Sequence, residues 1–506
     1  MKELRAQGLR NRRTIPWSAV PCPDVGAFRA QVVGAVARDW RLVALFGLPD
    51  GGLETRLVAI LADDARGVLV ATSTRVADRY PALTPDCPPA HLFEREIAEQ
   101  CGVVPEGHPW LKPLRRHPPD HAPPGRGGPG PKHDREAYPF FRVEGEQVHE
   151  VAVGPVHAGI IEPGHFRFQA HGEEVLFLEI MLGYQHRGVE RLLESWSGAR
   201  AVWVAESIAG DTVIGHAEAW CGVIEALSRC QKSPRGQAVR GLALELERLA
   251  NHIGDLGAMS GDIAFAPAAA EFGRLRGDCL NLLLTLSGNR FGRGLVRAGG
   301  VAFDVTPAIA QEMRARLLEV RQEFARAADL FFANDSVLAR LEGVGQVTRA
   351  RCLELGCVGP AARASGLERD VRHDHPYGIF RFTHIPVATV GSGDAAARAL
   401  VRRLEVERSL EFLIEQIAAL PRGAPLVPVA GGLAPEELAV GLVEGWRGEI
   451  AHVALTDARG QLRRYKVKDP SFHNWAALAA AMPGNQISDF PLCNKSFNLS
   501  YAGHDL

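Results

Sequence analysis

The sequence lacks paired cysteines. Its nine cysteines are scattered over 506 residues, and no two of them form a CxxC motif. Cys352 and Cys357 come closest to a ligand pair, but no second pair accompanies them, so we interpret them as ordinary thiols. Scattered, unpaired cysteines are typical of a reducing, cytoplasmic compartment. The pattern argues against an iron–sulfur cluster bound by this chain alone.

Long apolar runs and an excess of one charge are lacking as well. Arg, Glu or Gly interrupts each apolar run well before the ~18 residues that a membrane span needs. The 57 basic and 59 acidic residues leave a net charge of −2, which gives no broad field for nucleic acid or an anionic membrane. The amino terminus has basic residues but no apolar segment after them, so no secretory signal is expected, and Arg12 and Arg13 are most simply a solvated basic arm. We expect no nucleic-acid partner, and any link to a membrane should come through other proteins.

Nucleotide-binding motifs are also missing. Gly343 and Gly345 form a GxG in EGVGQV, but no third glycine or following acid completes a dinucleotide fingerprint. No GxxxxGK[ST] stretch is present either. The sequence therefore predicts neither a Rossmann domain nor a phosphate-binding loop.

Proline and glycine are concentrated in one segment. Residues 115–138 read RRHPPDHAPPGRGGPGPKHDREAY, with almost no apolar side chains, a composition typical of an extended, solvated linker. The segment predicts two domains, residues 1–114 and residues 139–506. In the first, a helix should begin at about Asp24, whose side chain suits an N-cap, and end near Arg38, with strand-like stretches WRLVALFGL and GVLVATS after it. We predict a small α+β domain.

The second domain is predicted to be mainly helical with a β-rich margin. It opens with the strand-like stretches HEVAVGPV and EVLFLEIMLGYQ. Apolar residues then recur at helical spacing in two places, which are Leu242, Leu246, Leu249 and Ile253, and later Leu410, Leu413, Ile417 and Leu420. The fold class of the whole chain is therefore α+β.

Several motifs in a fixed order carry a family resemblance. The stretch LFEREIAEQCGVVPEGHPWLKPLRR, Leu92 to Arg116, resembles a signature of the C subunit of respiratory complex I. The stretches VGPVHAGIIEPGHFRF, GYQHRGVERLL, ELERLANHIGDLG, VRAGGV, SGLERDVRHDHPYG, RGEIAHV and DPSFHNW follow in the order found in the complex I D subunit and in large subunits of membrane-bound [NiFe] hydrogenases. The fused arrangement, with NKSFNLSYAGHDL at the end, looks most like the formate hydrogenlyase and hydrogenase-4 type, especially its cysteine-poor members.

The resemblance implies a nickel–iron site that this sequence does not complete. Nickel members of the family hold the metals with two CxxC pairs, because soft thiolates bind nickel and iron. The first pair would fall on Ala209 and Thr212 in IAGDTVIGH, and the second on Ser500 and Gly503. None of these residues carries a thiol, so the chain is not expected to be a nickel hydrogenase. The vestigial pocket would comprise His157, Ala209, Gly210, Thr212, Ser500 and Gly503.

Other residues near these positions have two interpretations each. Asp211 could be a proton carrier with a raised pKa or the cap of a helix that begins in DTVIGHAEAW. Cys493 lies seven and ten residues before Ser500 and Gly503, too far to replace either, and Cys221 lies in a predicted core helix. We interpret both cysteines as structural.

His157 falls on a motif, GPxHP, whose histidine the resemblance associates with a quinone headgroup. An imidazole suits that task because it can donate a hydrogen bond and a proton. Ala158 replaces the proline of the motif, and the tyrosine that accompanies the histidine would align with Gly210. Tyr501 could supply the missing phenol or could simply be a packed aromatic residue.

Two further groups of polar residues remain ambiguous. His186 and Arg187 in GYQHRG could position a neighbouring cluster or satisfy backbone groups at a turn, and the second interpretation is favoured. Glu247, Arg248 and His252 share one predicted helix, where surface pairing one turn apart and a buried polar network are competing explanations.

The expected function is that of a subunit in a membrane-associated, complex I-like and formate hydrogenlyase-like oxidoreductase. His157, Asp211 and Tyr501 are the candidate catalytic residues of an acceptor pocket, which could take quinone. The resemblance implies a small iron–sulfur subunit similar to the B subunit of complex I, a ferredoxin-like subunit and membrane ion-translocating subunits as partners. It also implies a peripheral position on the cytoplasmic side of the membrane, with no cofactor held by this chain alone. The alternative is a non-redox scaffold that couples an electron-input module to ion-pumping subunits.

Overall fold

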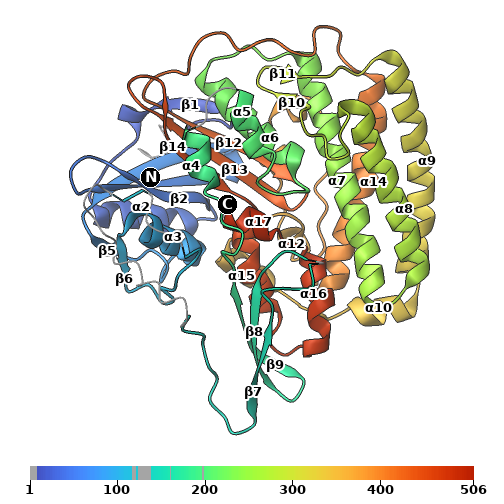
Figure 1. Cartoon of the computed structure of the whole chain (residues 1–506), viewed down its shortest axis with the longest axis horizontal. Helices are drawn as coiled ribbons and strands as arrows, with labels where there is room; N and C mark the ends of the chain where they lie inside the picture. Colours follow the sequence, from blue (N-terminus) through green and yellow to red (C-terminus); the bar gives the residue numbers. More distant parts are fainter. Residues whose placement is uncertain (1–7, 117–120, 123–137, 160, 196–198) are drawn as a thin grey trace.

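The computed structural model describes residues 8–116, 121–122, 138–159, 161–195 and 199–506. Figure 1 shows a small sheet with two helices on one side, a second sheet in the middle and a bundle of long helices on the other side. A slender three-stranded sheet projects below them. The predicted α+β class is confirmed, with a first part and a larger, mainly helical second part.

The first part is an antiparallel sheet in the order β2 (Arg41–Pro49), β3 (Thr55–Asp63), β4 (Val68–Val76). Helices α2 (Val25–Val36) and α3 (His91–Cys101) pack against it, and β5 (Arg79–Pro81) pairs with β6 (Val104–Glu106). The predicted cap is confirmed, because the Asp24 carboxylate accepts a hydrogen bond from the N–H of Ala27 at 2.9 Å. A local sequence signal therefore identified the start of α2.

The central sheet joins strands from the two ends of the chain. Its order is β1 (Arg13–Pro16), β12 (Glu437–Gly445), β13 (Gly448–Thr456), β14 (Leu462–Lys468), all antiparallel. Strand β1, which the sequence assigns to the first domain, pairs with β12 so that Ile15 lies opposite Leu438. The expectation of a solvated basic arm is wrong for Arg12, which is 5% exposed and bonds the Glu218 carboxylate at 2.6 Å.

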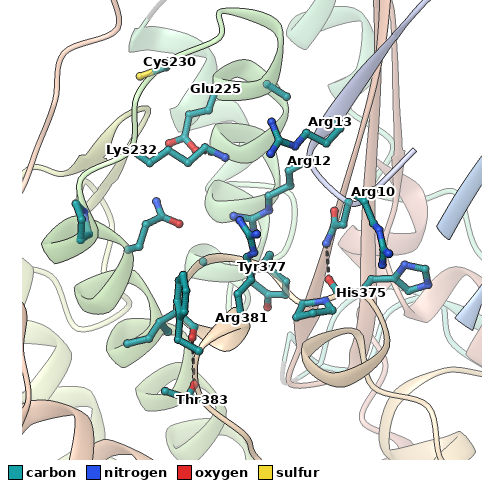
Figure 2. Close-up of a pocket in the computed structure, with 18 of the residues that line it drawn as sticks. Arg10, Arg12, Arg13, Glu225, Cys230, Lys232, His375, Tyr377, Arg381 and Thr383 are labelled. Carbon is teal, nitrogen blue, oxygen red and sulfur yellow. Dashed lines mark hydrogen bonds and ion pairs between the residues drawn. The ribbon is translucent and has the colours of Figure 1, made fainter. Parts of the chain in front are cut away.

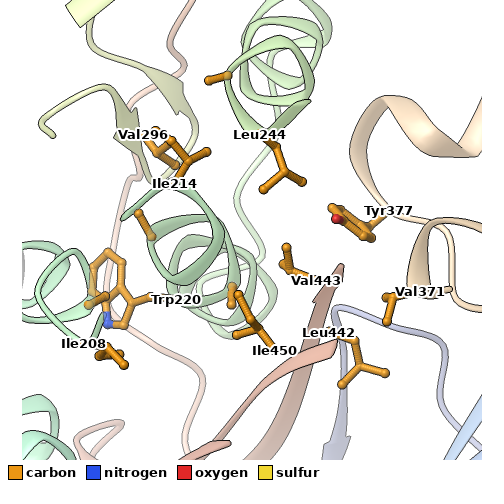
Figure 3. Packing of buried hydrophobic residues seen from close by; sticks show 14 of the residues in the cluster. Ile208, Ile214, Trp220, Leu244, Val296, Val371, Tyr377, Leu442, Val443 and Ile450 are labelled. Atoms are coloured by element: carbon orange, nitrogen blue, oxygen red, sulfur yellow. The ribbon is translucent and has the colours of Figure 1, made fainter. Parts of the chain in front are cut away.

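The main core lies between this sheet and two helices, α6 (Val213–Leu227) and α7 (Pro234–Asp262). Figure 3 shows Leu244 of α7 and Ile450 of β13 on one side of α6, with Ile214 and Trp220 of α6 on its other sides, next to Val296 and Ile208. Both faces of β12 and β13 are buried, which is why these strands read as almost continuous apolar runs rather than alternating ones. The core therefore fixes α6 rigidly to the sheet.

The helical bundle consists of α7, α8 (Ala266–Ser287), α9 (Pro307–Phe332) and α14 (Ala395–Ala418). The two predicted apolar repeats lie in α7 and α14 and are buried. Leu420 is the exception, because it lies beyond the end of α14 and is half-buried. Ser233 caps α7 by accepting a hydrogen bond from the N–H of Gly236. None of the described helices is both long and apolar enough to span a membrane.

The projecting sheet consists of β7 (Val148–Val153), β8 (His165–His171) and β9 (Glu174–Met181). A short pair, β10 (Val296–Arg297) and β11 (Gly300–Val301), lies near the start of α7. The shorter helices are α4 (Val189–Ser195), α5 (Ala199–Ala205), α10 (Asp335–Leu341), α11 (Arg349–Leu355), α12 (Gly359–Arg363), α13 (Val371–Asp374), α15 (Ser471–Ala481), α16 (Phe490–Phe497) and α17 (Tyr501–Asp505).

Most of the predicted linker, residues 117–120 and 123–137, lies outside the described residues. At two described positions the expectation of a solvated chain is wrong. Arg115 is 3% exposed and donates to the carbonyl oxygen of His504 at 2.8 Å. His121 is 5% exposed and contacts the Glu194 carboxylate at 3.1 Å. These contacts come from distant parts of the chain, which composition does not reveal.

Candidate functional site

The first segment of the site is the turn that leads into α6. Ala209 is fully buried, whereas its neighbour Gly210 is exposed. Thr212 is the N-cap residue of α6. Its hydroxyl oxygen accepts hydrogen bonds from the indole of Trp446 at 3.1 Å and from the guanidinium of Arg447 at 3.2 Å. The turn is thus tied to the β12–β13 connection.

The N-terminus of α6 is capped by another helix. The carboxylate of Glu247 on α7 accepts hydrogen bonds from the N–H groups of Ile214 at 2.7 Å and Gly215 at 3.1 Å. Burial raises the pKa of Glu247 to about 8, although both N–H groups favour the anion. The alternative in which Asp211 caps this helix is therefore wrong.

The second segment connects α16 to α17 near the carboxyl end. Ser500 is the N-cap residue of α17, and its hydroxyl accepts a hydrogen bond from the N–H of Gly503 at 2.9 Å. A Cβ atom at Gly503 would lie 2.6 Å from Cγ of Asp469, closer than any normal contact. The Ser500 hydroxyl therefore caps a helix, and the Asp469 carboxylate occupies the space that a side chain at Gly503 would need.

Arg447 bridges the two segments. Its Nη1 and Nη2 atoms lie 2.5 and 2.8 Å from the two carboxylate oxygens of Asp211, and its Nε donates to the carbonyl oxygen of Asn498 at 2.5 Å. The arginine side chain is 4% exposed, and that of Asp211 is 33% exposed. A bidentate ion pair of this kind is strong and directional. It locks the turn before α6 to the segment before α17.

Arg187 makes a second bridge between the same segments. Its guanidinium donates to the carbonyl oxygens of Ser207, Ile208 and Ala502 at 2.6, 2.9 and 3.2 Å. The Nδ1 atom of His186 contacts the carbonyl oxygen of Asp505 at 2.7 Å. The favoured interpretation of these two residues, backbone satisfaction at a turn, is confirmed.

The ionisation of Asp211 differs from the sequence-based expectation. Burial disfavours its charge, but the adjacent Arg447 charge and hydrogen bonds outweigh burial, so the pKa of Asp211 is held below its ordinary value. The prediction of a raised pKa is therefore wrong. Burial raises the pKa of a second carboxyl besides Glu247, that of Glu162, which accepts a hydrogen bond from the N–H of Tyr501 at 3.3 Å.

A buried chain of polar side chains runs inward from Asp469. Its carboxylate lies 3.0 Å from Nε2 of His216, whose Nδ1 lies 3.1 Å from Nε2 of His452. The Nδ1 atom of His452 contacts the hydroxyl of Tyr465 at 2.8 Å. Sequence reasoning missed this chain, although His216 ends the stretch ESIAGDTVIGH. The other three members lie more than 200 residues away along the chain, so no local signal joins them.

His157 is half-buried in the loop between β7 and β8. Its Nε2 lies 2.9 Å from the carbonyl oxygen of Gly164, and its ring centroid lies 5.9 Å from that of Phe166. Ala158 has a φ angle of 54°, which the fixed ring of proline does not permit. The loop geometry therefore accounts for the alanine at a position where the motif has proline.

Tyr501 lies on the other side of Gly164. A Cβ atom at Gly164 would lie 2.6 Å from the tyrosine ring, and the Tyr501 ring packs edge-on against Trp475 at 4.7 Å and against Phe166 at 6.4 Å. Its hydroxyl has no hydrogen bond of normal geometry to a described residue, and burial raises the pKa of Tyr501 to about 12. The structure thus brings Tyr501 and His157 together around Gly164 and Phe166.

Three of the residues predicted around the pocket are buried. Ala209, Ser500 and Tyr501 are each at most 5% exposed, and Arg447 bridges the two segments. At Gly210, by contrast, a Cβ atom built there would meet no atom within 4 Å. The vestigial pocket as a whole stays a prediction.

Comparisons with known proteins agree with both parts of the fold. Residues 32–126 match the family described as "Respiratory-chain NADH dehydrogenase, 30 Kd subunit". Residues 256–430 and 426–505 match "Respiratory-chain NADH dehydrogenase, 49 Kd subunit". Formate hydrogenlyase subunit 5 of Escherichia coli is 30% identical over 84% of this chain and 77% of its own length. The chain belongs to the complex I-like large-subunit family. It is a member in which 30 kDa-like and 49 kDa-like parts are fused.

Two other members of the complex I-like large-subunit family are also similar to this chain. Hydrogenase-4 component G of Escherichia coli is 28% identical over 84% of this chain and 76% of its own length. The D subunit of NADH-quinone oxidoreductase from Clostridium beijerinckii is 27% identical over 66% of this chain and 91% of its own length. The family thus includes subunits of hydrogenases and of quinone oxidoreductases, and the predicted resemblance is confirmed.

The four positions that the resemblance assigns to nickel–iron ligands carry no sulfur. They have a methyl group, two hydroxyls and a hydrogen atom. The Ser500 hydroxyl caps α17, and the Thr212 hydroxyl accepts hydrogen bonds from Trp446 and Arg447. Over the described ranges, no group of three or more His, Cys, Asp or Glu side chains is placed to hold a metal ion. Cys493 packs against Gly345 and Arg398, and Cys221 is buried in α6. The structural interpretation of these two cysteines fits these positions.

The polar residues of α7 form a buried network. Arg248 contacts the carboxylates of Glu245 at 3.1 Å and Glu405 at 3.4 Å, and Nε2 of His252 lies 2.8 Å from Glu405. All four side chains are at most 3% exposed. The buried-network explanation is therefore correct for this helix, and surface pairing is not.

Proposed function

We propose that the chain is the large subunit of a membrane-associated, complex I-like oxidoreductase and forms an acceptor pocket beside the iron–sulfur cluster of a partner protein, without hydrogenase activity. The observation that carries this proposal is the Arg447–Asp211 ion pair. It fills the gap between two segments whose metal-ligand positions have no sulfur. An arginine and a carboxylate neutralise each other and contribute no redox chemistry of their own.

The acceptor would bind next to His157 and Tyr501. Both side chains carry groups that can donate hydrogen bonds to a carbonyl oxygen, as a quinone requires. They lie on either side of Gly164, and the exposed backbone at Gly210 leaves open space nearby. Relatives named as D subunits of NADH-quinone oxidoreductase support quinone as the class of acceptor.

The experiment is quinone reduction by the assembled complex with His157→Ala or Tyr501→Phe. We expect the alanine variant to lose about 100-fold in kcat/KM, as for removal of a proton donor, and the phenylalanine variant about fivefold, as for one lost hydrogen bond. The matched control is His149→Ala, which removes an exposed histidine of β7. Wild-type turnover in both site variants, with the complex intact, would refute the acceptor pocket.

The partner iron–sulfur protein would cover the surface around the site. Large apolar side chains are exposed there, with Val156 80%, Ile161 46%, Tyr184 40% and Trp203 54% exposed. Exposed apolar residues on segments that flank one site are typical of a protein interface. We expect Val156→Asp to reduce co-purification of the iron–sulfur partner, and Leu284→Asp on α8, where the leucine is 45% exposed, to leave it unchanged. Equal recovery with both variants would exclude this face.

A scaffold without redox chemistry is the second candidate function. The feature that favours it is the dense packing of Tyr501, which is 5% exposed and enclosed by Trp475 and Phe166. A scaffold would couple an electron-input module, including a ferredoxin-like subunit, to membrane ion-translocating subunits from a peripheral position on the cytoplasmic side. Full electron transfer through a complex that carries both His157→Ala and Tyr501→Phe would favour this second function.

A further inference from the structure

A large cavity lies at the opposite end of α6 from Asp211 and Arg447. Its volume is about 1430 Å³, and Figure 2 shows residues that line it. Gly67 and residues near the end of α14 contribute to the lining, but most of it comes from three places in the chain. These are the N-terminal segment 10–14, the connection between α6 and α7 at residues 225–237, and the loop 375–383. Helix α6 has 15 residues, which at 1.5 Å per residue separates the cavity from the site by roughly 20 Å.

The lining of this cavity is strongly cationic. Among the described residues, six basic side chains contribute to it, namely Arg10, Arg12, Arg13, Arg229, Lys232 and Arg381, against one acid, Glu225. Because the whole chain carries a net charge of −2, this excess of positive charge is a local feature. A recess lined by one sign of charge concentrates ions of the other sign.

The acidic groups near the cavity are already neutralised by cations. One oxygen of Glu225 lies 2.5 Å from Arg240 and the other lies 3.4 Å from Lys232. Glu218, behind the lining, pairs with Arg12 at 2.6 Å and with Arg240 at 3.2 Å. Neither carboxylate is left to balance the remaining arginines of the cavity.

Arg12 has hydrogen-bonding capacity that the protein does not use. The residue is 5% exposed, and its guanidinium carbon lies 4.2 Å above the ring of Tyr377. Nη1 bonds Glu218, but Nε and Nη2 have no acceptor among the described residues. A Cβ atom at Gly222 of α6 would lie 2.7 Å from this Nε, so Nε faces the helix, and Arg12 contributes its positive charge to the wall of the cavity. In Figure 2 the Arg12 side chain runs along the cavity toward Tyr377.

Arg229 lies 3.7 Å from the Glu437 carboxylate, whereas three other arginines of the rim form no ion pair with a described residue. Within the part of the chain that the structure describes, Arg10 donates to the backbone oxygens of Arg66 and Gly67, at 3.1 and 3.3 Å. Arg13 and Arg381 are exposed, and neither forms an ion pair with a described residue. Guanidinium groups bind phosphate and carboxylate oxygens in a bidentate manner.

We propose that this cavity binds a small multivalent oxyanion, with two or more phosphate or carboxylate groups. Its volume exceeds that of a single inorganic anion, and its cations enter from opposite walls, so a ligand with several anionic groups satisfies more of them than a monovalent ion does. Guanidinium and ammonium groups recognise phosphates and carboxylates in the same way, and titration with pyrophosphate and with citrate distinguishes the two. This inference is independent of the acceptor pocket.

The test is isothermal titration of the full chain, within its complex where needed, with inorganic pyrophosphate and separately with citrate. We expect saturable binding of at least one probe, weakened by about tenfold or more in Arg13→Gln/Arg381→Gln, because two charge-assisted contacts are lost. The matched control is Arg314→Gln/Arg321→Gln, which removes two exposed arginines of α9. The probe that binds more tightly identifies the chemistry.

Two results would overturn the proposal. The first is the absence of binding for both probes at millimolar concentration and low salt. The second is an equal loss of affinity in the α9 control variant, because that outcome would mean unspecific attraction by surface charge. Both double variants alter exposed side chains, so their thermal unfolding midpoints without ligand should match that of the wild type, and binding can be compared directly.

Discussion

Replacement of Arg447 by methionine tests whether the ion pair holds the two segments together. The variant keeps most of the side-chain volume but removes the contacts to Asp211 and to the carbonyl oxygen of Asn498. Loss of one partner from a fully buried pair costs about 3–5 kcal/mol. Since the Asp211 side chain is 33% exposed, water solvates part of its charge, and we expect about 2–3 kcal/mol for the pair.

The unpaired carbonyl of Asn498 adds about 1 kcal/mol, so Arg447→Met should lower the free energy of unfolding by about 3–4 kcal/mol. Adding Asp211→Asn should recover part of this loss, because no buried carboxylate then remains, with a coupling energy above about 1 kcal/mol. Urea unfolding followed by tryptophan fluorescence measures both, since the Arg447 guanidinium lies 3.9 Å from the Trp446 ring.

The control for this cycle is Arg321→Met, which removes an exposed arginine of α9 and should change stability by less than about 0.5 kcal/mol. The reasoning would be refuted if Arg447→Met unfolded at the same urea concentration as the wild type. It would also be refuted if the effects of the two site substitutions simply added, because independent effects would mean that the ion pair does not link the segments.

Three other predictions concern the same region. In the folded protein Glu247 keeps its proton between pH 4.5 and about 8, whereas the unfolded chain releases it. The free energy of unfolding should therefore fall by up to about 1.4 kcal/mol per pH unit as pH rises through this window. Glu247→Gln should flatten the profile of unfolding midpoint against pH, and an unchanged slope would contradict the assignment. Gly503→Ala should destabilise the chain by about 1–3 kcal/mol, because the new Cβ would meet the Asp469 carboxylate. Gly273→Ala on the open face of α8 should instead stabilise the chain by up to about 1 kcal/mol. Equal unfolding temperatures for the two variants would argue against steric exclusion at Gly503. Elemental analysis of anaerobically purified protein should give far less than one nickel per chain, and a value of about one nickel per chain would reverse the conclusion on the metal site.

Sequence signals were sufficient where a structural element depends on its neighbours in the chain. Asp24 identified the start of α2 because an N-cap residue bonds an N–H only three positions away. The leucine spacing in α7 identified a buried helix face for the same reason. Family motifs extended the prediction to the site, and the four positions without sulfur could be read directly from the sequence.

The protonation of the site could not be predicted in this way. A raised pKa was one of two alternatives for Asp211, yet Arg447, 236 residues later, lowers this pKa. The sequence suggested surface pairing or a buried network for Glu247. Its actual role as the cap of α6 depends on how α6 and α7 cross. Each pKa reflects partners that only the folded chain brings within hydrogen-bonding distance.

The sequence by itself determined the α+β class, the long helices, the family and the absence of thiolate ligands, because these follow from residue identity and short-range spacing. The tertiary structure alone decided what replaces the missing ligands and where charge accumulates. It joined Arg447 to Asp211, paired β1 with β12 and placed Arg12 in a cationic cavity with residues more than 200 positions away. Hydrogen bonds and ion pairs act over a few ångströms, and chain folding sets which distant residues come that close.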